Sequence, residues 1–259
     1  MTTTFERGFA GVERSAIAAA KTSGAIVAAA KQLQRAAQEG DINKLRKAAE
    51  RLSAATDAAR QDIANAKTAW PFGEQEEKAY LADAYQVELL EEAERAGLTI
   101  QARDARLIAF PSILQLLPTD LAVRVDRKRV TAIRPSHLVR TLLANQSKKA
   151  RYPSERFLEA LYSAYRLIAG PDGGGPILLS RVYQAFTLQP GAAAEYDKGD
   201  FARDIFMLDR SGVTRTRRGF RLSLPAVSTG TRVGSSDVFT FVAPDGELVR
   251  YHGLQFTEE

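Results

Sequence analysis

The stretch VTRTRRGFRLSL, residues 213–224, alternates polar and apolar side chains on both sides of Arg218-Gly219. Alternation with a period of two is typical of a half-buried strand, and a glycine between two such runs indicates a turn. The stretch therefore predicts a two-stranded hairpin. Four of its twelve residues are arginines, so this hairpin would be strongly basic.

Three helices are expected immediately before the hairpin, over residues 154–168, 177–188 and 200–211. Each has apolar residues that recur every three or four positions, as one buried face of a helix requires. Ser154 and Asp200 are suited to cap the first and third helices, because their side-chain oxygens can accept hydrogen bonds from the first turn.

Three helices followed by a short basic hairpin resemble the winged helix-turn-helix domain of bacterial transcription regulators, over residues 154–225 and at the level of the fold. In that family the third helix enters the major groove and the wing holds the DNA backbone. The resemblance implies base contacts by Arg203, Met207 and Arg210. It implies phosphate contacts by the hairpin residues Arg215, Arg217, Arg218 and Arg221.

The third helix departs from the usual basic pattern. Between Lys198 and Ser211, three basic residues stand against three aspartates. Carboxylates in a groove would repel phosphate, whereas the hairpin arginines would attract it. The pattern favours backbone contact with weak sequence preference, or a winged helix that contacts proteins instead, since a fold does not decide a function.

The net charge of +5 is distributed unevenly along the 259 residues. Residues 1–120 carry 15 basic and 17 acidic residues, residues 121–221 carry 19 and 9, and residues 222–259 carry 2 and 5. The middle block therefore has a balance of +10. Such a field attracts a polyanion or an acidic partner protein.

The amino-terminal third predicts an antiparallel, coiled-coil-like helical hairpin. Apolar and small residues recur at alternating steps of four and three, first at Phe5, Phe9, Val12, Ala16, Ala19, Ser23, Ile26, Ala30, Leu33 and Ala37, then at Ile42, Leu45, Ala49, Leu52, Thr56, Ala59, Ile63, Ala66 and Trp70. Gly40-Asp41 separates the two runs, and this pair can end one helix and cap the next. Nineteen of the 59 residues from Gly11 to Ala69 are alanine, so the hairpin buries little area. We expect residues 5–70 to dock on a second copy, on their own domain or on another protein.

The remaining segments predict short strands and further helices. A helix is expected from Glu74 to Ala96, short strands over residues 98–133, and a helix from Pro135 to about Ser147. A basic tip, Asp126-Arg127-Lys128-Arg129, separates two alternating runs, and Arg127, Lys128 and Arg129 are candidate phosphate contacts. A last hairpin is expected over residues 237–253, around Asp245-Gly246.

The predicted fold class is α+β and mainly helical, in three parts. Residues 1–73 form the alanine-rich helical hairpin, and residues 74–152 form a helix with short strands and the basic tip. Residues 153–259 form a winged-helix-like domain with an additional β-hairpin.

Composition and motifs argue against an enzyme. The chain has no cysteine and two histidines, and it contains none of the HExxH, GxSxG, GxGxxG or GxxxxGK[ST] spacings. Asp200 and Asp204 stand one helical turn apart, yet no third ligand with metal spacing lies near them in the sequence. We expect no catalytic residue, no metal and no cofactor.

The sequence predicts a non-enzymatic, cytoplasmic, bacterial DNA-associated protein. No stretch without charge is longer than 13 residues, the length of Leu107 to Thr119, which is short of the ~20 that cross a bilayer. Met1 to Glu6 lack a basic segment followed by an apolar one, which argues against a signal peptide. The alternative is an adaptor or scaffold subunit of a larger complex, such as one that contains an ATPase, with the winged helix and the helical arm both contacting proteins.

Overall fold

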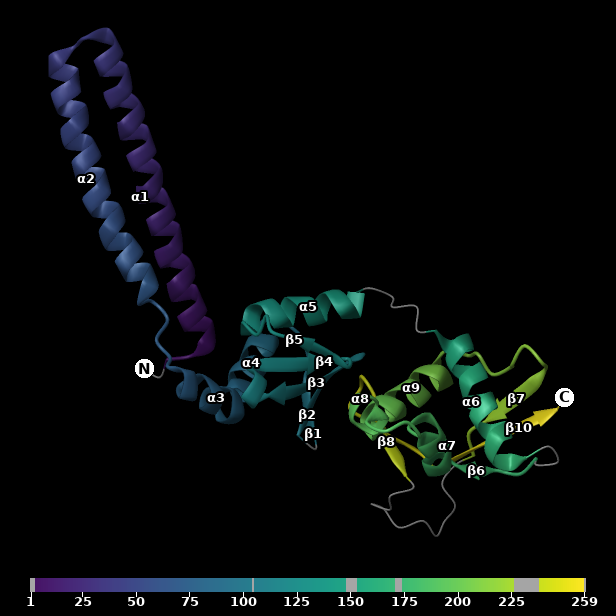
Figure 1. The fold of residues 1–259 in the computed structure, drawn as a ribbon. Coiled ribbons are helices and arrows are strands. Elements are labelled where there is room, and N and C mark those ends of the chain that lie inside the picture. The colour runs from purple at the N-terminus through teal and green to yellow at the C-terminus, as the bar shows by residue number, and fades with distance from the viewer. Residues whose placement is uncertain (1–2, 104, 148–152, 171–173, 226–237, 259) are drawn as a thin grey trace. The chain divides into compact units, whose positions relative to one another are not determined.

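The computed structural model describes residues 3–103, 105–147, 153–170, 174–225 and 238–258 (Figure 1). The chain forms two compact units. Unit 1 comprises Met1–Arg95, Leu117–Leu121 and Ala132–Val139, and unit 2 comprises Ala96–Leu116, Ala122–Thr131 and Arg140–Glu259. The fold mixes helices and sheets and has an amino-terminal helical pair, as the sequence predicts.

The helical pair in unit 1 consists of α1 (Phe5–Glu39) and α2 (Ile42–Lys67), which run side by side in opposite directions (Figure 1). Thr4 and Asp41 cap the two helices, because their side chains accept hydrogen bonds from the amides of Arg7 and Lys44. Gly40 closes α1 at φ 70°, a left-handed conformation that glycine adopts without strain. The predicted turn at Gly40-Asp41 is confirmed.

The predicted contact face of this pair is correct at every seventh residue from Phe5 to Leu33 and from Leu52 to Ala66. Between these positions the residue before the predicted one is buried or half-buried, and Phe9, Ser23 and Thr56 are half-buried as predicted. In α1 the buried and half-buried side chains include 5, 8, 12, 15, 19, 22, 26, 29, 33 and 36. In α2 they include 48, 52, 55, 59, 62 and 66. Seven residues that were expected in the seam are exposed, namely Ala16, Ala30, Ala37, Ile42, Leu45, Ala49 and Ile63. Runs of alanine, such as Ala28-Ala29-Ala30 in α1 and Ala48-Ala49 in α2, allow either of two adjacent residues to be assigned to the contact face.

Aromatic rings hold the base of the helical pair. Phe5 stacks on Tyr80 with ring centroids 4.6 Å apart and also contacts Trp70, Phe72 and Tyr85. Gly8 is required beside them, because a Cβ at this position would lie 2.9 Å from a ring carbon of Trp70. These large rings supply the buried area that the alanines of the hairpin lack.

The segment expected as one helix from Glu74 to Ala96 forms two helices, α3 (Glu74–Asp83) and α4 (Tyr85–Arg95). The break at Ala84 accompanies the burial of both Leu81 and Tyr85. The first turn of α4 then presents a buried carboxylate, that of Glu88, to the start of α1. The 3-10 helix η1 (Pro118–Asp120) also belongs to unit 1.

Glu88 holds the amino terminus of α1. Its carboxylate accepts hydrogen bonds from the amides of Phe5 (3.2 Å) and Glu6 (2.9 Å) and from the Tyr80 hydroxyl (2.9 Å). A buried anion at a helix amino terminus satisfies amides that have no partner within the helix and interacts favourably with the helix dipole.

We expect Glu88→Ala to lower the free energy of unfolding of unit 1 by about 3 kcal/mol, because it leaves three donors without their buried acceptor. Urea denaturation followed by far-UV circular dichroism measures this loss. Glu91→Ala, an exposed change in the same helix, is the control. Equal stability of the two variants would contradict the role given to Glu88.

Unit 2 contains a five-stranded antiparallel sheet in the order β1-β2-β3-β4-β5. Its strands are β1 (Gln101–Arg103), β2 (Arg106–Ala109), β3 (Ser112–Leu117), β4 (Ala122–Val125) and β5 (Lys128–Val130). Val125 pairs with Lys128, so Asp126 and Arg127 alone form the tip, both with positive φ. Lys128 and Arg129, expected at the tip, belong to β5. The helix α5 (Pro135–Ser147) begins at the predicted proline.

The carboxy-terminal half of unit 2 contains the three predicted helices, α6 (Ser154–Ala169), α7 (Leu179–Phe186) and α9 (Lys198–Arg210), with the short α8 (Ala192–Glu195) between the last two. A three-stranded sheet in the order β6-β10-β7 joins β6 (Ile177–Leu178), β10 (Gly253–Glu258) and β7 (Phe220–Ser223). The predicted last hairpin is β8 (Phe239–Val242) paired with β9 (Leu248–Tyr251); Asp237 lies outside the described residues.

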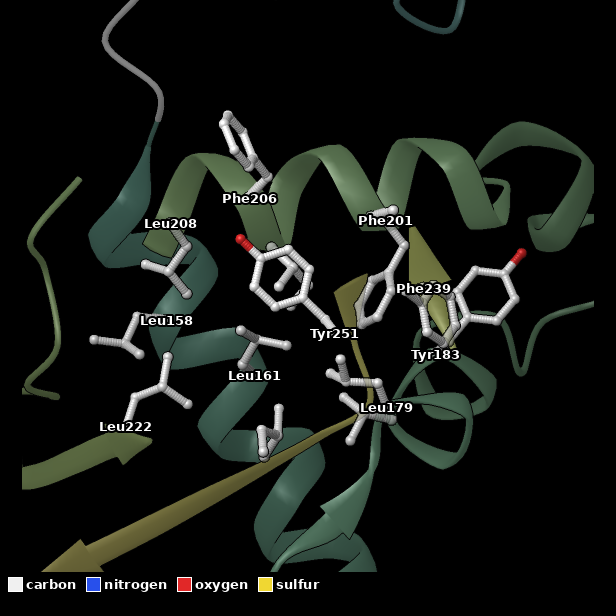
Figure 2. Packing of buried hydrophobic residues seen from close by; sticks show 14 of the residues in the cluster. Leu158, Leu161, Leu179, Tyr183, Phe201, Phe206, Leu208, Leu222, Phe239 and Tyr251 are labelled. Atoms are coloured by element: carbon white, nitrogen blue, oxygen red, sulfur yellow. The ribbon is translucent and has the colours of Figure 1, made fainter. Parts of the chain in front are cut away.

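The largest core lies between α6, α7 and α9. Figure 2 shows Leu158 and Leu161 of α6, Leu179 and Tyr183 of α7, and Phe201 of α9 converging on it. Phe206 points to the other side of α9 (Figure 2). Its ring lies 5.0 Å from that of Phe241 in β8. Helix α9 is therefore packed on more than one side, and eight of its thirteen residues are buried.

Candidate nucleic-acid interface

The predicted basic hairpin is present over residues 214–222. Arg215 pairs with Arg221 in an antiparallel bridge, and Thr214 accepts a hydrogen bond from the Leu222 amide. The turn is closed by Gly219, whose amide donates to the Thr216 carbonyl and whose φ of 88° favours glycine. Arg217 and Arg218 therefore lie in the turn itself.

The body of unit 2 holds this hairpin in place. The Phe220 ring stacks on Tyr162 of α6 at 4.8 Å, and Leu222 is buried. The buried Thr216 hydroxyl accepts a hydrogen bond from the Phe220 amide, and the Arg217 amide donates to the Glu159 carboxylate at 2.6 Å. Pairing of β7 with β10 then fixes the outgoing strand.

All four hairpin arginines are exposed. Arg215 and Arg221 lie directly opposite each other, so their side chains share one face of the ribbon. Arg217 and Arg218 extend from the turn, and neither guanidinium has an ion pair with another described residue. The hairpin thus concentrates four positive charges at one exposed edge of unit 2.

The second basic group, around the β4–β5 tip, belongs to a different part of unit 2. The Arg127 guanidinium lies 5.2 Å from the centre of the Tyr196 ring, a cation–π contact, while Lys128 and Arg129 are exposed on β5. A cation–π contact holds a guanidinium but leaves its N–H groups able to bind an anion. This group lies on the five-stranded sheet, whereas the hairpin continues into β7 of the three-stranded sheet.

Arg203 is not positioned to contact a base, and the expectation that it faces DNA is wrong. It is 7 % exposed, and its guanidinium binds Asp126 at 2.7 Å and Asp204 at 3.1 Å. Asp126 in turn accepts hydrogen bonds from the Ser112 hydroxyl and the Ile113 amide. Arg203 therefore fastens α9 to the β3–β4 region, and exposing it would leave buried carboxylates unpaired.

Met207 and Arg210 also do not form the exposed, groove-reading face of α9 that the resemblance implies. Met207 is half-buried and packs against the hydrophobic core. Arg210 is exposed at the end of α9, where its guanidinium lies 5.6 Å from the centre of the Phe206 ring. Of the three residues expected at bases, only Arg210 is exposed, so α9 offers no row of side chains for reading a groove.

A second ionic cluster fixes the start of α9. The Asp197 carboxylate caps the helix by accepting hydrogen bonds from the Gly199 and Asp200 amides. The same carboxylate pairs with Arg124 of β4 at 2.5 Å and with Arg106 of β2 at 2.9 Å. A Cβ at Gly199 would meet the Arg106 guanidinium, so a larger residue there would displace this arginine from its ion pair with Asp197. Sequence reasoning missed this cluster, since Asp197 is 73 positions from Arg124 and 91 positions from Arg106.

Asp200 and Asp204, which were considered as possible metal ligands, pair with arginines of unit 2 instead. Asp204 binds Arg203 and accepts a hydrogen bond from the Tyr196 hydroxyl at 2.9 Å. Asp200 is 2 % exposed, and it lies 3.7 Å from Arg203 and 3.9 Å from Arg124. Among the residues that the structure describes, no group of three or more His, Cys, Asp or Glu side chains could hold a metal ion.

The described helices include none with the length and apolar character needed to cross a membrane. Comparison of the chain with known protein families, with curated proteins and with solved structures finds no match.

We expect Asp200→Asn to become progressively more stable than the wild type as the pH rises above about 4. Burial raises the pKa of Asp200 above the ordinary value of 3.8, although the nearby guanidinium of Arg203 opposes the shift. The unfolded chain then loses this proton at a lower pH than the folded chain, so the wild type loses stability until the folded pKa is passed.

Urea unfolding of both proteins between pH 4 and pH 7 measures this difference, with Asp83→Asn as an exposed control. A wild type that gains stability over Asp200→Asn as the pH rises would contradict the raised pKa.

Proposed function

We propose that the protein is a non-enzymatic DNA-associated binding protein that contacts the duplex backbone through the hairpin at residues 214–222. The observation that carries this proposal is the placement of four exposed arginines on one ribbon that is rigidly anchored to α6. Arginine recognises phosphate well, because its planar fork can donate two hydrogen bonds to one phosphate group.

The arrangement of unit 2 supports a winged-helix reading of this half. Three main helices, α6, α7 and α9, precede the basic hairpin, and a small antiparallel sheet closes the domain. The hairpin then takes the place of the wing, which in winged helices grips the backbone. The β8–β9 hairpin, inserted between β7 and β10, is an addition to that plan.

The expected binding depends little on DNA sequence. Base recognition needs side chains that reach the edges of the bases in a groove. Most residues of α9 are buried, and the Arg203 guanidinium is ion-paired with Asp126 and Asp204. Contacts made by the hairpin would go to phosphates, which position a protein without specifying a sequence. Arg127, Lys128 and Arg129 are candidates for additional phosphate contacts.

The alternative is an adaptor or scaffold subunit that binds an acidic protein surface with the same hairpin. One observation favours it: Glu159 of α6 lies against the hairpin turn and contacts the Arg217 amide. The Glu159 carboxylate repels phosphate and so weakens the attraction between the hairpin and a continuous phosphate backbone. An acidic protein surface can place its carboxylates away from Glu159 and avoid this repulsion. In both proposals, the DNA-associated protein and the scaffold subunit, the α1–α2 helical pair is the arm that contacts a second copy or another protein.

Fluorescence anisotropy with random duplex DNA at several salt concentrations tests the proposal. We expect a log–log slope of several units for the wild type, reduced by about one each in Arg217→Ala and Arg218→Ala, as loss of one phosphate contact predicts. Arg35→Ala, an exposed arginine in α1, is the matched control and should leave the slope unchanged.

The expected losses should be the same for unrelated DNA sequences, because phosphate contacts carry no sequence information. Binding weaker than about 100 µM at low salt would overturn the DNA proposal and leave the scaffold alternative. An unchanged slope in both hairpin variants would place the contact elsewhere on the protein.

A further inference from the structure

A cavity of about 750 Å³ lies in unit 2 between the β4–β5 tip, the first turns of α6 and one side of α9, and we call it the α6–α9 cavity. Its lining residues all belong to unit 2 and do not include those of the hairpin at residues 214–222. Sites for small organic ligands usually have volumes of roughly 300 to 1,000 Å³. The α6–α9 cavity is therefore large enough to be a ligand site of its own.

One wall of the cavity is aromatic. It consists of Phe157 of α6, Phe186 of α7 and Tyr196, which follows α8. The Phe186 ring centre lies 5.9 Å from that of Phe157 and 6.2 Å from that of Tyr196, so the three rings adjoin one another. All three residues are half-buried, which leaves part of each accessible from the cavity. Such a wall favours a flat apolar body, because aromatic rings pack closely against one another.

The floor of the cavity is an ionic cluster whose charges already offset one another. Arg203 is buried and binds Asp126 at 2.7 Å and Asp204 at 3.1 Å. Asp204 also accepts a hydrogen bond from the Tyr196 hydroxyl at 2.9 Å. These carboxylates are held by donors of the protein itself, so the floor does not call for a cationic ligand.

The rim of the cavity is positive. Arg127 at the β4–β5 tip and Arg156 in the first turn of α6 are both exposed, and neither has an ion pair with another residue that the structure describes. Together with the floor, three guanidinium groups stand against two carboxylates, a balance of +1. The amino terminus of α6 adds the positive end of a helix dipole beside Arg156. A ligand with one negative charge matches this balance.

The backbone at the rim is strained, and the strained residue is one of these arginines. Asp126 and Arg127 have φ values of 47° and 71°, so two successive residues adopt the left-handed conformation in a two-residue hairpin turn. Glycine is strongly preferred at the second position of such a turn. An arginine kept there, with its guanidinium 5.2 Å from the centre of the Tyr196 ring, indicates that the side chain is needed.

We propose that the α6–α9 cavity binds a small organic anion that has a flat aromatic body and a single negative charge. The body packs against the aromatic wall, and the acidic group accepts hydrogen bonds from Arg127 and Arg156. A guanidinium binds such a group through two parallel hydrogen bonds, and the cation–π contact of Arg127 leaves its N–H groups able to donate them.

This proposal goes beyond the proposed function, in which the exposed hairpin arginines contact a polyanion. A phosphate backbone is charged at every residue and is flexible or convex, whereas the cavity is concave and has an apolar wall. The carboxylates of Asp126 and Asp204 on its floor would also repel a second phosphate group. A small monoanion avoids both difficulties, because it places one charge at the rim and its apolar part inside.

Two fluorescent probes of the same shape test the proposal on the full chain. 8-Anilinonaphthalene-1-sulfonate has two aromatic systems and one negative charge, and N-phenyl-1-naphthylamine has the same rings without the sulfonate. Both become brighter in an apolar site, so a fluorescence titration gives a dissociation constant for each. Comparison of the two separates the contribution of the charge from that of the aromatic wall.

The first variant, Arg127→Gly, removes the rim charge and places glycine where the backbone favours it. We expect the dissociation constant of the sulfonate to rise by about tenfold or more, as loss of a hydrogen bond to a charged group predicts, and that of the neutral probe to stay unchanged. The urea midpoint should not fall, because glycine adopts a positive φ without strain. A lower midpoint with unchanged sulfonate affinity would show that Arg127 serves the fold and would overturn the proposal.

The second variant, Arg156→Ala, removes the other rim charge from a different element. We expect it to weaken binding of the sulfonate and to leave the neutral probe unaffected, as Arg127→Gly does. Arg181→Ala is the matched control, because Arg181 is an exposed arginine of α7 that does not line the cavity. It should leave both dissociation constants unchanged.

Four other results would overturn the proposal. They are the absence of saturable sulfonate binding by the wild type, an equal loss of affinity for both probes in the rim variants, an equal loss in Arg181→Ala, and displacement of the sulfonate by duplex DNA. The last result would assign the cavity to a phosphate backbone. The salt slope of DNA binding in the hairpin variants is measured separately, so failure of the cavity proposal leaves the DNA proposal standing, and the reverse also holds.

Discussion

The buried ion pairs of Arg203 decide what unit 2 can present to a partner. Arg203 binds Asp126 at the β4–β5 tip and Asp204 on its own helix, which fastens α9 to the edge of the five-stranded sheet. Removing two or three charges from water is costly, so such a cluster persists only when its geometry is fully satisfied. Because Arg203 is buried in these ion pairs, the basic side chains that unit 2 can present to a partner include the exposed arginines of the hairpin and not Arg203.

The rigidity of the hairpin matters as much as its charge. Stacking of Phe220 on Tyr162, the buried Thr216 hydroxyl and pairing with β10 order the ribbon before any ligand binds. A pre-ordered ribbon loses less conformational entropy on binding than a flexible loop of the same composition would. The four arginines can therefore act together on a polyanion, although each contact is individually weak.

Local patterns predicted the elements well, because the information needed lies within a few residues. Gly40-Asp41 predicted the helix turn, and Arg218-Gly219 predicted the hairpin. The contacts that decide function depend on tertiary packing instead: Arg203 pairs with a residue 77 positions away, and nothing in its neighbourhood distinguishes it from a surface arginine. The one-residue error in the α1–α2 face arose because alanine fits buried and exposed positions alike, so burial was decided by the bulky residues at the base.

Asp197 joins several parts of unit 2 through one side chain. It caps α9 with one carboxylate oxygen and binds guanidinium groups from β2 and β4 with the other. The helix start and two strands therefore share an anchor, so local opening of any one of them strains the other two. Amide protons in the first turn of α9 and in the centres of β2 and β4 should consequently exchange with solvent as one cooperative group, with a common opening free energy.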